Sequence, residues 1–386
     1  MSITAWTHST PPFPSTLTRS RLDTPRVESL ADDEVLIEVD AASLNPVDVQ
    51  LANLAIWRLA AFNQTPRPLG KDFAGTVIAR GARVDKFDVG TRVMGVSLNP
   101  LASASYGTLS QVAVVDTKRA CVVEWPSHLS AAEACSLPLA FLTAVTTLSP
   151  PYLVLPPPRD DEEERPAIVV LGASSAVGIY AVQYARNVLG LDVVATASTR
   201  NVAFVSSTLG ATTVVDYTRT DRLVDELLAA RPRRGFVSII DCVGGTELFD
   251  DDRRRRGTTT TTTTWRELLR PRDGQYKEGG SYTTIVGDKT ARDRLGGHAS
   301  NYWTPTQLWR SLTGWFGFSP RYHCVSLNLE RPSWLEQVGP LVADGKLEVV
   351  VDSEYDFDQV PQAFAKLVTG KATGKIVVHV KDSKRR

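Results

Sequence analysis

The chain has few cysteines and few histidines for its length. Only 4 cysteines and 5 histidines occur in 386 residues. The cysteines are widely separated and form no Cys-x-x-Cys pair; they are Cys121, Cys135, Cys242 and Cys324. This spacing argues against a disulfide framework and against a cysteine-based zinc site. We expect incidental thiols in a reducing compartment.

The chain also lacks an excess of either charge and a long apolar run. Lys plus Arg and Asp plus Glu are both 43, so the formal net charge is zero. This balance argues against a broad nucleic-acid-binding surface, and we expect no nucleic-acid partner. No segment approaches the roughly 20 apolar residues of a transmembrane helix, and the N-terminus carries no targeting pattern. We expect a cytoplasmic protein, with peripheral membrane attachment as an alternative.

What the chain does contain is a change of pattern near residue 131. The first 120 residues read as short strands and glycine-rich turns, as in a compact β-rich domain. Ser130, with Glu133 three residues later, predicts a helix start, and a second helix is expected from about Leu139 to Leu148. Strands are expected at 33–41, 76–79, 92–96 and 111–115.

From residue 167 onward, apolar strands alternate with helices. This alternation indicates a doubly wound parallel sheet whose strands are buried on both faces. The fold class is therefore α/β, with a β-rich domain and a Rossmann-type domain. Strands are expected at 167–171, 192–197, 213–216, 236–241 and 281–286, and a helix at about 221–230.

Two polar segments interrupt this pattern, and the tail departs from it. Residues 149–166 read as a proline-rich, acidic exposed loop, and a low-complexity insertion is expected near 250–280. The tail predicts a strand at 346–352, a helix at 360–368 and a strand at 375–380 that rejoins the first domain. We expect one domain at 1–137, completed by 341–386, and a second at 138–340.

The segment after the strand at 167–171 is the strongest local motif. Small residues there let a backbone approach a pyrophosphate, and the helix that follows offers free N–H groups at its N-terminus. A serine stands at the middle glycine position of the usual pattern, so a tight turn without a ligand is the alternative. We interpret the motif as a dinucleotide site formed by Gly172, Ala173, Ser174, Ser175, Ala176, Val177 and Gly178.

The end of the second strand of this domain indicates which dinucleotide binds. An NAD site usually places a carboxylate there to bind the ribose 2′-OH. This chain has Ser198-Thr199-Arg200-Asn201 instead, and hydroxyls with a guanidinium suit a 2′-phosphate. The sequence favours NADPH over NADH; a solvated Arg200 is the alternative. Later turns are expected to wall the ribose and nicotinamide through Cys242, Val243, Val286 and Gly287.

Ordered landmarks along nearly the whole chain resemble one enzyme superfamily. They lie at 41–48, 69–75, 87–95, 137–144, 172–178 and 370–378. In this order they resemble the medium-chain dehydrogenase/reductase superfamily, in its zinc-independent, quinone-oxidoreductase-like branch. The resemblance implies a GroES-like catalytic domain and a Rossmann cofactor domain. Details at 33–75 and 282–289 resemble a fungal subgroup similar to reticulon-interacting mitochondrial reductases, with members linked to lipid droplets and mitochondria.

Two landmarks bear on metal binding. Alcohol dehydrogenases of the superfamily hold a catalytic zinc through a cysteine in the first landmark and a Gly-His-Glu in the second. This chain has Asn45 and Gly70-Lys71-Asp72 at these places. Asparagine is a poor zinc ligand, and an ammonium must lose its proton to become one. We expect no metal, which leaves hydride delivery to an already electrophilic carbon in a quinone or an enone.

The resemblance also implies roles for single residues. Asn45 and Thr143 would help to place the nicotinamide end of the cofactor, and Asp48 would order the loop after Asn45. Tyr217 matches a tyrosine that lies near the adenosine 2′-phosphate in relatives.

A proton donor is harder to identify. Related enoyl reductases carry a tyrosine soon after the first landmark, whereas residues 51–70 contain none. A quinone can take its proton from solvent, so this absence favours quinone reduction, with trans-enoyl or enone reduction as the alternative. Lys71, Asp72 and Tyr106 are fallback donors.

Aromatic residues are dense between Tyr302 and Phe318. Such a segment can lie in a membrane interface, which defines a second class of function: a non-enzymatic member associated with lipid droplets or membranes. It can equally wall a substrate pocket or form a dimer contact. A monomer and a homodimer both agree with the sequence.

Overall fold

The computed structural model describes most of the chain, with gaps. Within the described residues, the strands form one sheet of three strands, one of six and one of seven. The expected threonine-rich segment, Tyr106 and residues 288–303 lie outside the described part. The described residues are 2–9, 11–54, 58, 66–97, 107–157, 164–244, 248, 265–274, 276–287, 304–325, 327, 329 and 331–381.

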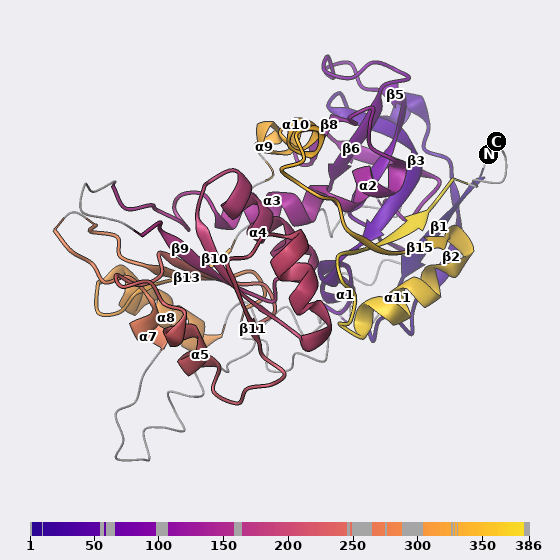
Figure 1. Ribbon diagram of the computed structural model, residues 1–386. Helices are drawn as coiled ribbons and strands as arrows, with labels where there is room; N and C mark the ends of the chain where they lie inside the picture. The colour runs from indigo at the N-terminus through magenta and orange to yellow at the C-terminus, as the bar shows by residue number, and fades with distance from the viewer. Residues whose placement is uncertain are drawn as a thin grey trace.

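The first domain is built on the seven-stranded sheet. Its strand order is β15-β16-β3-β5-β6-β8, with β7 paired to β3. Strands β2-β1-β4 form a separate small sheet, whose Trp6 is buried in the core of this domain. Figure 1 shows the yellow C-terminal elements β15 and α11 beside the indigo strands of this domain. The strands are β1 Ser2–His8, β2 Thr18–Asp23, β3 Glu34–Leu44, β4 Arg67–Pro68, β5 Asp72–Arg80, β6 Arg92–Val96, β7 Val112–Asp116, β8 Cys121–Glu124, β15 Val351–Asp356 and β16 Lys375–His379.

The second domain contains the six-stranded sheet, in the order β11-β10-β9-β12-β13-β14. All of its strand pairs are parallel. β9 is buried along its whole length, as expected for a central strand covered on both faces. The strands are β9 Ala167–Leu171, β10 Asp192–Ala197, β11 Thr213–Asp216, β12 Ser238–Asp241, β13 Ser281–Thr284 and β14 Arg321–Cys324.

Helices cover both faces of this parallel sheet. Ile168 and Val170 point into a core shared with α3 and α4, whereas Val169 and Leu171 point into a core shared with α5 and α7. This alternation is the two-residue period of a strand. The α-helices of the described residues are α1 Pro46–Ala52, α2 Ala131–Ser136, α3 Pro138–Thr147, α4 Ala176–Asn187, α5 Leu223–Ala229, α7 Trp265–Leu268, α8 Pro305–Trp315, α9 Pro332–Glu336, α10 Val338–Ala343 and α11 Val360–Val368.

Most predicted elements are confirmed, including the helix start at Ser130, where Ser130 and Glu133 form a capping box. The tail rejoins the first domain, because β16 pairs with β3. The exact domain limits, near residues 137 and 340, stay a prediction.

Two expectations are corrected. The strand expected at 346–352 begins only at Val351, because Gln183 of α4 donates to Glu348 O and accepts from Glu348 N, in place of a neighbouring strand. The insertion expected near 250–280 is shorter at its end, because Trp265 and Leu268 are buried in the core.

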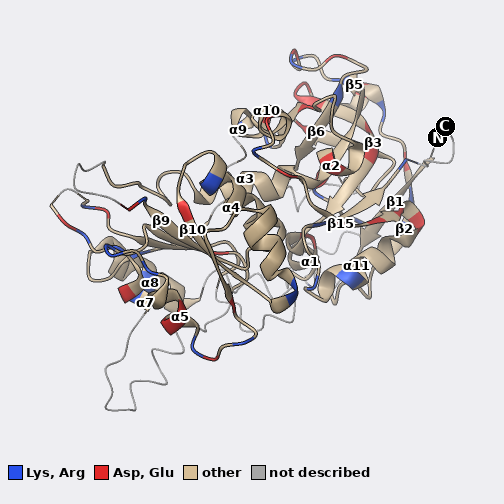
Figure 2. Ribbon diagram, viewed as in Figure 1, with Lys and Arg blue, Asp and Glu red and all other residues tan. Residues whose placement is uncertain are grey.

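Two observations concern the surface. None of the helices in the described residues has the length and apolarity needed to cross a bilayer. Figure 2 shows basic and acidic residues spread over both domains, without a large area of one sign.

Candidate active site

The glycine-rich turn lies between β9 and α4, at the carboxyl edge of the parallel sheet. Gly172 has a φ of 75°, which favours glycine, and its N–H donates to Thr196 Oγ1 of β10 at 3.0 Å. Ser175 is the N-cap of α4, and its Oγ accepts from Gly178 N at 3.1 Å. The predicted strand–turn–helix context is confirmed.

Packing requires glycine at two positions of this turn. A Cβ on Gly172 would lie 2.1 Å from a methyl carbon of Val243, and one on Gly178 would lie 2.4 Å from Gly172 O. Residues 174–177 between them are partly exposed at the start of α4. Small side chains and a helix N-terminus therefore meet at one accessible place, an arrangement that suits a pyrophosphate.

The ends of β12 and β13 form two further turns beside this one. At each end, a side chain of the last strand residue accepts two backbone N–H groups from the turn that follows. β12 lies next to β9 and β13 lies next to β12, and all three strands are parallel, so the predicted turn residues share the carboxyl edge of the sheet. Asp241 accepts from Val243 and Gly244, and Thr284 accepts from Val286 and Gly287. Cys242 is buried there, and burial raises the pKa of its thiol.

A buried polar network occupies the facing part of the first domain. Asn45 and Lys375 are each 2% exposed and Asp72 is fully buried. Lys375 Nζ donates to Asn45 Oδ1 at 2.5 Å and to Asp72 Oδ2 at 2.9 Å. Asp72 Oδ2 also accepts from Asn45 Nδ2 at 2.9 Å and from Ser43 Oγ at 3.1 Å. The amide of Asn45 is thus engaged at both ends within the protein.

This network continues into the cofactor domain through α3. Asp72 Oδ1 accepts from the N–H of Leu139, in the first turn of that helix, at 2.9 Å. The carbonyl of Leu139 in turn accepts from Thr143 Oγ1 at 2.7 Å. Thr143, expected at the nicotinamide end, is therefore connected to the network through one residue.

Asp48 and Lys71 are a second buried pair of charged residues. Asp48 accepts from Asn45 N at 2.8 Å and so orders the start of α1, as expected. Burial raises the pKa of Asp48 to about 6, although the charge of Lys71 opposes the shift. Burial likewise lowers the pKa of Lys71 from its ordinary value, with Asp48 opposing. Desolvation therefore outweighs attraction for both groups.

Two family models match different parts of this chain. The alcohol dehydrogenase GroES-like domain matches residues 31–127, and the model described as zinc-binding dehydrogenase matches residues 209–378. The chain belongs to the medium-chain dehydrogenase/reductase superfamily.

Curated relatives match nine tenths of this superfamily member. The 2-methylene-furan-3-one reductase of Solanum lycopersicum is 29% identical over 361 residues, covering 92% of this chain and 73% of the relative. The chloroplast envelope quinone oxidoreductase homolog of Arabidopsis thaliana is 28% identical, with 90% and 89% covered. The mitochondrial NAD(P)H oxidoreductase RTN4IP1 of Homo sapiens is 27% identical, with 90% and 82% covered.

Solved structures share the fold of this superfamily member. The quinone oxidoreductase from Coxiella burnetii superposes with a TM-score of 0.71 at 24% identity, covering 99% of this chain and 100% of that chain. A mycobacterial protein solved in complex with NADPH superposes with a TM-score of 0.70 at 22% identity, covering 98% and 99%.

The metal landmarks of the superfamily do not form a zinc-ligand set here. Asn45, Lys71 and Asp72 stand at these positions, and the described residues contain no cluster of three His, Cys, Asp or Glu side chains that could hold a metal. Asp72 Oδ2 already accepts from three donors, including an ammonium. A metal ion there would have to displace the charge of Lys375.

The place expected for a 2′-phosphate lies at the end of β10. Ser198 and Arg200 flank Thr199, and one guanidinium nitrogen of Arg200 donates to Lys371 O at 2.7 Å. No carboxylate follows β10 directly, but the neighbouring strand brings Asp216 beside it, where Asp216 accepts from Thr199 Oγ1 at 2.5 Å. Tyr217 follows Asp216, and its N–H donates to Ala197 O.

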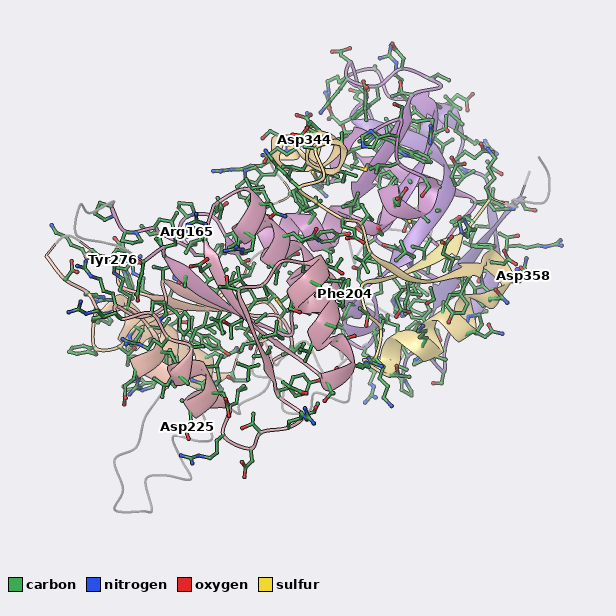
Figure 3. The ribbon with its side chains drawn as sticks, in the orientation of Figure 1. Arg165, Phe204, Asp225, Tyr276, Asp344 and Asp358 are labelled. Atoms are coloured by element: carbon green, nitrogen blue, oxygen red, sulfur yellow. The ribbon has the colours of Figure 1, made fainter. Side chains whose placement is uncertain are left out.

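The two domains meet directly at the glycine-rich turn between β9 and α4. Gly374 forms a parallel bridge with Ser175, and Thr373 Oγ1 donates to Asn201, whose Nδ2 donates to Ser174 Oγ at 2.9 Å. Figure 3 shows side chains of both domains meeting near Phe204, whereas Asp225 and Tyr276 lie on the far side of the cofactor domain.

Sequence reasoning missed several of these residues. Lys375, Asn201 and Thr373 were not predicted as site residues, although the segment 370–378 was one of the landmarks that resemble the superfamily. Their roles depend on contacts between residues far apart in the chain, as with Lys375 and Asn45. Tyr106, expected as a fallback donor, lies outside the described residues.

Proposed function

We propose that this protein is a zinc-independent, NADPH-dependent oxidoreductase that reduces a quinone or an activated carbon–carbon double bond. One observation carries the proposal: the metal landmarks are filled by a buried ammonium network, while the glycine-rich turn presents the capped N-terminus of α4. Relatives with quinone oxidoreductase and furanone reductase names support this chemistry.

In this proposal the chain binds and aligns the cofactor. The backbone of 174–178 would bind the pyrophosphate, and Ser198, Arg200 and Tyr217 would surround the 2′-phosphate. When bound, the nicotinamide supplies a hydride to the acceptor. Thr143 and the turns after β12 and β13 would hold the nicotinamide end in register with that acceptor.

The acceptor must already be electrophilic in this proposal. The side chains of Lys375 and Asn45 bind each other and Asp72, so neither polarises a carbonyl as a Lewis acid would. A quinone can take its proton from water. An enone needs a proton at carbon, and Lys71 is the buried group in the described residues that we propose as its source, since burial favours loss of its proton. Comparing NADPH oxidation with a quinone and with an α,β-unsaturated ketone separates the two reactions.

Cofactor choice is tested by titration with NADPH and NADH. We expect the wild type to prefer NADPH, and Arg200→Ala to weaken NADPH binding about 10-fold, the value of one charge-assisted hydrogen bond, without changing NADH binding. Arg222→Ala is the control, because Arg222 is an exposed arginine paired with Asp225 on α5. Equal affinity of the wild type for both cofactors would contradict the 2′-phosphate assignment. The nearby carboxylate of Asp216, which accepts from Thr199 Oγ1, works against binding of a 2′-phosphate by its charge.

A second proposed property is contact with a lipid surface, by the outward face of α8 and the turn after it. Gln307 and Gly314 face the protein, whereas large apolar side chains face outward, the reverse of a normal amphipathic helix. A monomeric soluble protein rarely exposes such a patch. Its members and their exposed fractions are Leu308 61%, Trp309 68%, Leu312 37%, Trp315 80%, Phe316 68% and Phe318 84%.

Charge agrees with an anionic lipid surface. Apart from Arg270, which is buried, the described residues of 265–287 and 304–325 include five Lys or Arg residues against three Asp or Glu residues, whereas the whole chain is neutral. Protein on lipid droplets or mitochondria, alongside a cytoplasmic pool, would follow from such contact.

Liposome flotation tests this contact. We expect the wild type to float with vesicles containing anionic lipid, and Trp309→Ser with Trp315→Ser to reduce the bound fraction at least about 5-fold, since interfacial aromatics provide the burial. Val89→Ser, which removes a 63% exposed apolar residue elsewhere, should float as the wild type does. Failure of the wild type to float would contradict the lipid contact. A dimer that dissociates when the two tryptophans are replaced would show that this face binds a second copy of the chain.

A further inference from the structure

The proposed function uses Lys375 only as a sign that no metal is held at the landmarks, and gives this residue no role in the reaction. Lys375 begins β16, one residue beyond the pair formed by Ile376 and Leu44, so the register of the sheet places it opposite Asn45. A buried ammonium is costly unless oxygen atoms surround it. Here Asn45 Oδ1 and Asp72 Oδ2 provide two of them.

The oxygen atoms that bind this ammonium belong to the two landmarks that hold zinc in metal-binding members of the superfamily. Asn45 stands in the first landmark and Asp72 in the second. An ammonium and a metal ion share one property, a fixed positive charge that orders the oxygen or nitrogen atoms around it. The residues do not fit a metal, but they do fit a cation supplied by the chain.

A direct chain of contacts connects this cation with the cofactor domain. Lys375 binds one oxygen of Asp72, and the other oxygen accepts from the N–H of Leu139 at 2.9 Å. The carbonyl of Leu139 accepts the hydroxyl of Thr143 at 2.7 Å. Three consecutive hydrogen bonds therefore run from the last strand of the first domain to the residue expected at the nicotinamide.

We propose that Lys375 is a positioning residue for the proposed reduction: its ammonium fixes Asn45 and Asp72 and, through Leu139, the hydroxyl of Thr143. This inference rests on the proposed function. Lys375 does not contact the reacting atoms. It sets the register between the domain that forms the acceptor side and the helix that carries Thr143, so its loss should affect hydride transfer more than cofactor binding.

The test uses the full-length protein and single-turnover oxidation of bound NADPH by a quinone such as duroquinone. Lys375→Met removes the charge at similar length. We expect it to slow hydride transfer about 100-fold, the effect of a shift of about 1 Å in a reacting pair. The Kd for NADPH should stay within about 3-fold, because the Lys375 side chain binds Asn45 and Asp72, whereas the contact with the pyrophosphate turn is made by the backbone of Gly374, which the substitution leaves in place.

Two further variants test whether the charge at this position matters and whether the effect is specific to Lys375. Lys375→Arg keeps the charge and should recover most of the rate, to within about 5-fold of wild type. Lys381→Met is the matched control: it removes another lysine of the same tail, one that pairs with Glu38 and Asp40 at the surface, and should leave the rate unchanged.

A buried carboxylate left without its cation can prevent folding. The double variant Asp72→Asn with Lys375→Met avoids this problem, because the amide oxygen can still accept from Leu139. It should fold and remain slow. A wild-type rate in this double variant, or in Lys375→Met, would overturn the proposal, and so would a rise in the NADPH Kd equal to the loss of rate.

Failure of the proposed function gives a different result. A wild type that does not bind NADPH overturns the function and this inference together. A wild type that binds NADPH but reduces neither quinone nor enone overturns the function alone. The position of the nicotinamide is then read from the emission of bound NADPH, which Lys375→Met should change and Lys381→Met should not; unchanged emission in Lys375→Met overturns the inference.

Discussion

At the scale of single residues, burial determines the behaviour of the charged groups in the candidate site. Asp48 is 1% exposed and Lys71 is 4% exposed. Each has its pKa moved toward the neutral form by desolvation, and the opposite charge nearby offsets only part of that shift. The candidate site therefore holds two titratable groups whose neutral forms are favoured more strongly than they would be in water.

Asp48→Asn should change how stability depends on pH. The pKa of Asp48 is about 6 in the folded protein and about 3.9 in an unfolded chain. Between these values the folded state binds a proton that the unfolded state does not, so this group stabilises the fold as pH falls and loses that effect as pH rises through 6. From pH 7.5 to 4.5 the gain is about 2 kcal/mol. Urea unfolding at both pH values measures it.

In the asparagine variant that gain should be absent, since the amide does not titrate. The difference in free energy of unfolding between the variant and the wild type should therefore shift by about 2 kcal/mol between the two pH values. Parallel stability profiles for the two proteins would show that Asp48 keeps an ordinary pKa.

The role of a site residue was predictable from the sequence where its interaction is local. The resemblance to the superfamily implied that Asp48 orders the loop after Asn45, and the two residues, three apart in the chain, form a capping box. Lys375 was not predictable in this way. Its partner Asn45 lies 330 residues away, and a lysine at a strand start is ordinarily solvated.

At the scale of elements, a segment of the first domain closes against the dinucleotide turn. Gly374 has a φ of 88°, and a Cβ there would lie 2.4 Å from Val350 O. Its N–H donates to Ser174 O. The backbone at Gly374 therefore contacts both residues 346–350 and the turn that we propose binds the pyrophosphate.

Gly374→Ala should weaken both the fold and cofactor binding. The positive φ and the close carbonyl together should cost about 1–3 kcal/mol in the free energy of unfolding, and the displaced backbone should raise the Kd for NADPH. Gly345→Ala is the matched control, since Gly345 has a φ of 67° with open space around its Cβ. Comparable losses in the two variants would mean that backbone strain alone, and not the contact, is responsible.

Elements with a regular apolar period were predicted well. Segments whose backbone hydrogen bonds go to side chains were not. β9 and α11 match their expected ranges because their apolar patterns are regular. Residues 346–350 are rich in β-branched and apolar side chains, yet Gln183 binds the backbone of Glu348. A sequence pattern does not show that a glutamine from another helix replaces a neighbouring strand.

At the scale of the whole molecule, the two domains share buried contacts. The network from Lys375 to Leu139 and the bridge between Ser175 and Gly374 both cross the boundary. Opening the domains would expose a buried ion pair, so we expect them to unfold together, although proteins of two domains often do not.

Thermal unfolding with NADPH checks this expectation. A single transition should be seen, and NADPH at 100 times its Kd should stabilise the folded state by about 2.7 kcal/mol. Because both domains would unfold in one step, the whole transition should move to higher temperature. Two transitions, of which only one responds to NADPH, would show that the domains unfold independently.

The pairing of β3 with β16 has a consequence for the order in which the molecule is made. Strands β9 to β14 are contiguous in the chain, so the cofactor domain can fold while translation continues. β3 leaves the ribosome early but gains β16 as its neighbour only after Ile376 has been added. Until then the part of β3 from Ala41 to Leu44 lacks its neighbour and is open to other chains, although β7 can already pair with Glu34–Glu38 on the same edge. Asn45 and Asp72 also lack their cation. The candidate site is therefore completed only when β16 has been synthesised, and a chain stopped before Lys375 would contain a formed cofactor domain beside an unfinished, association-prone sheet.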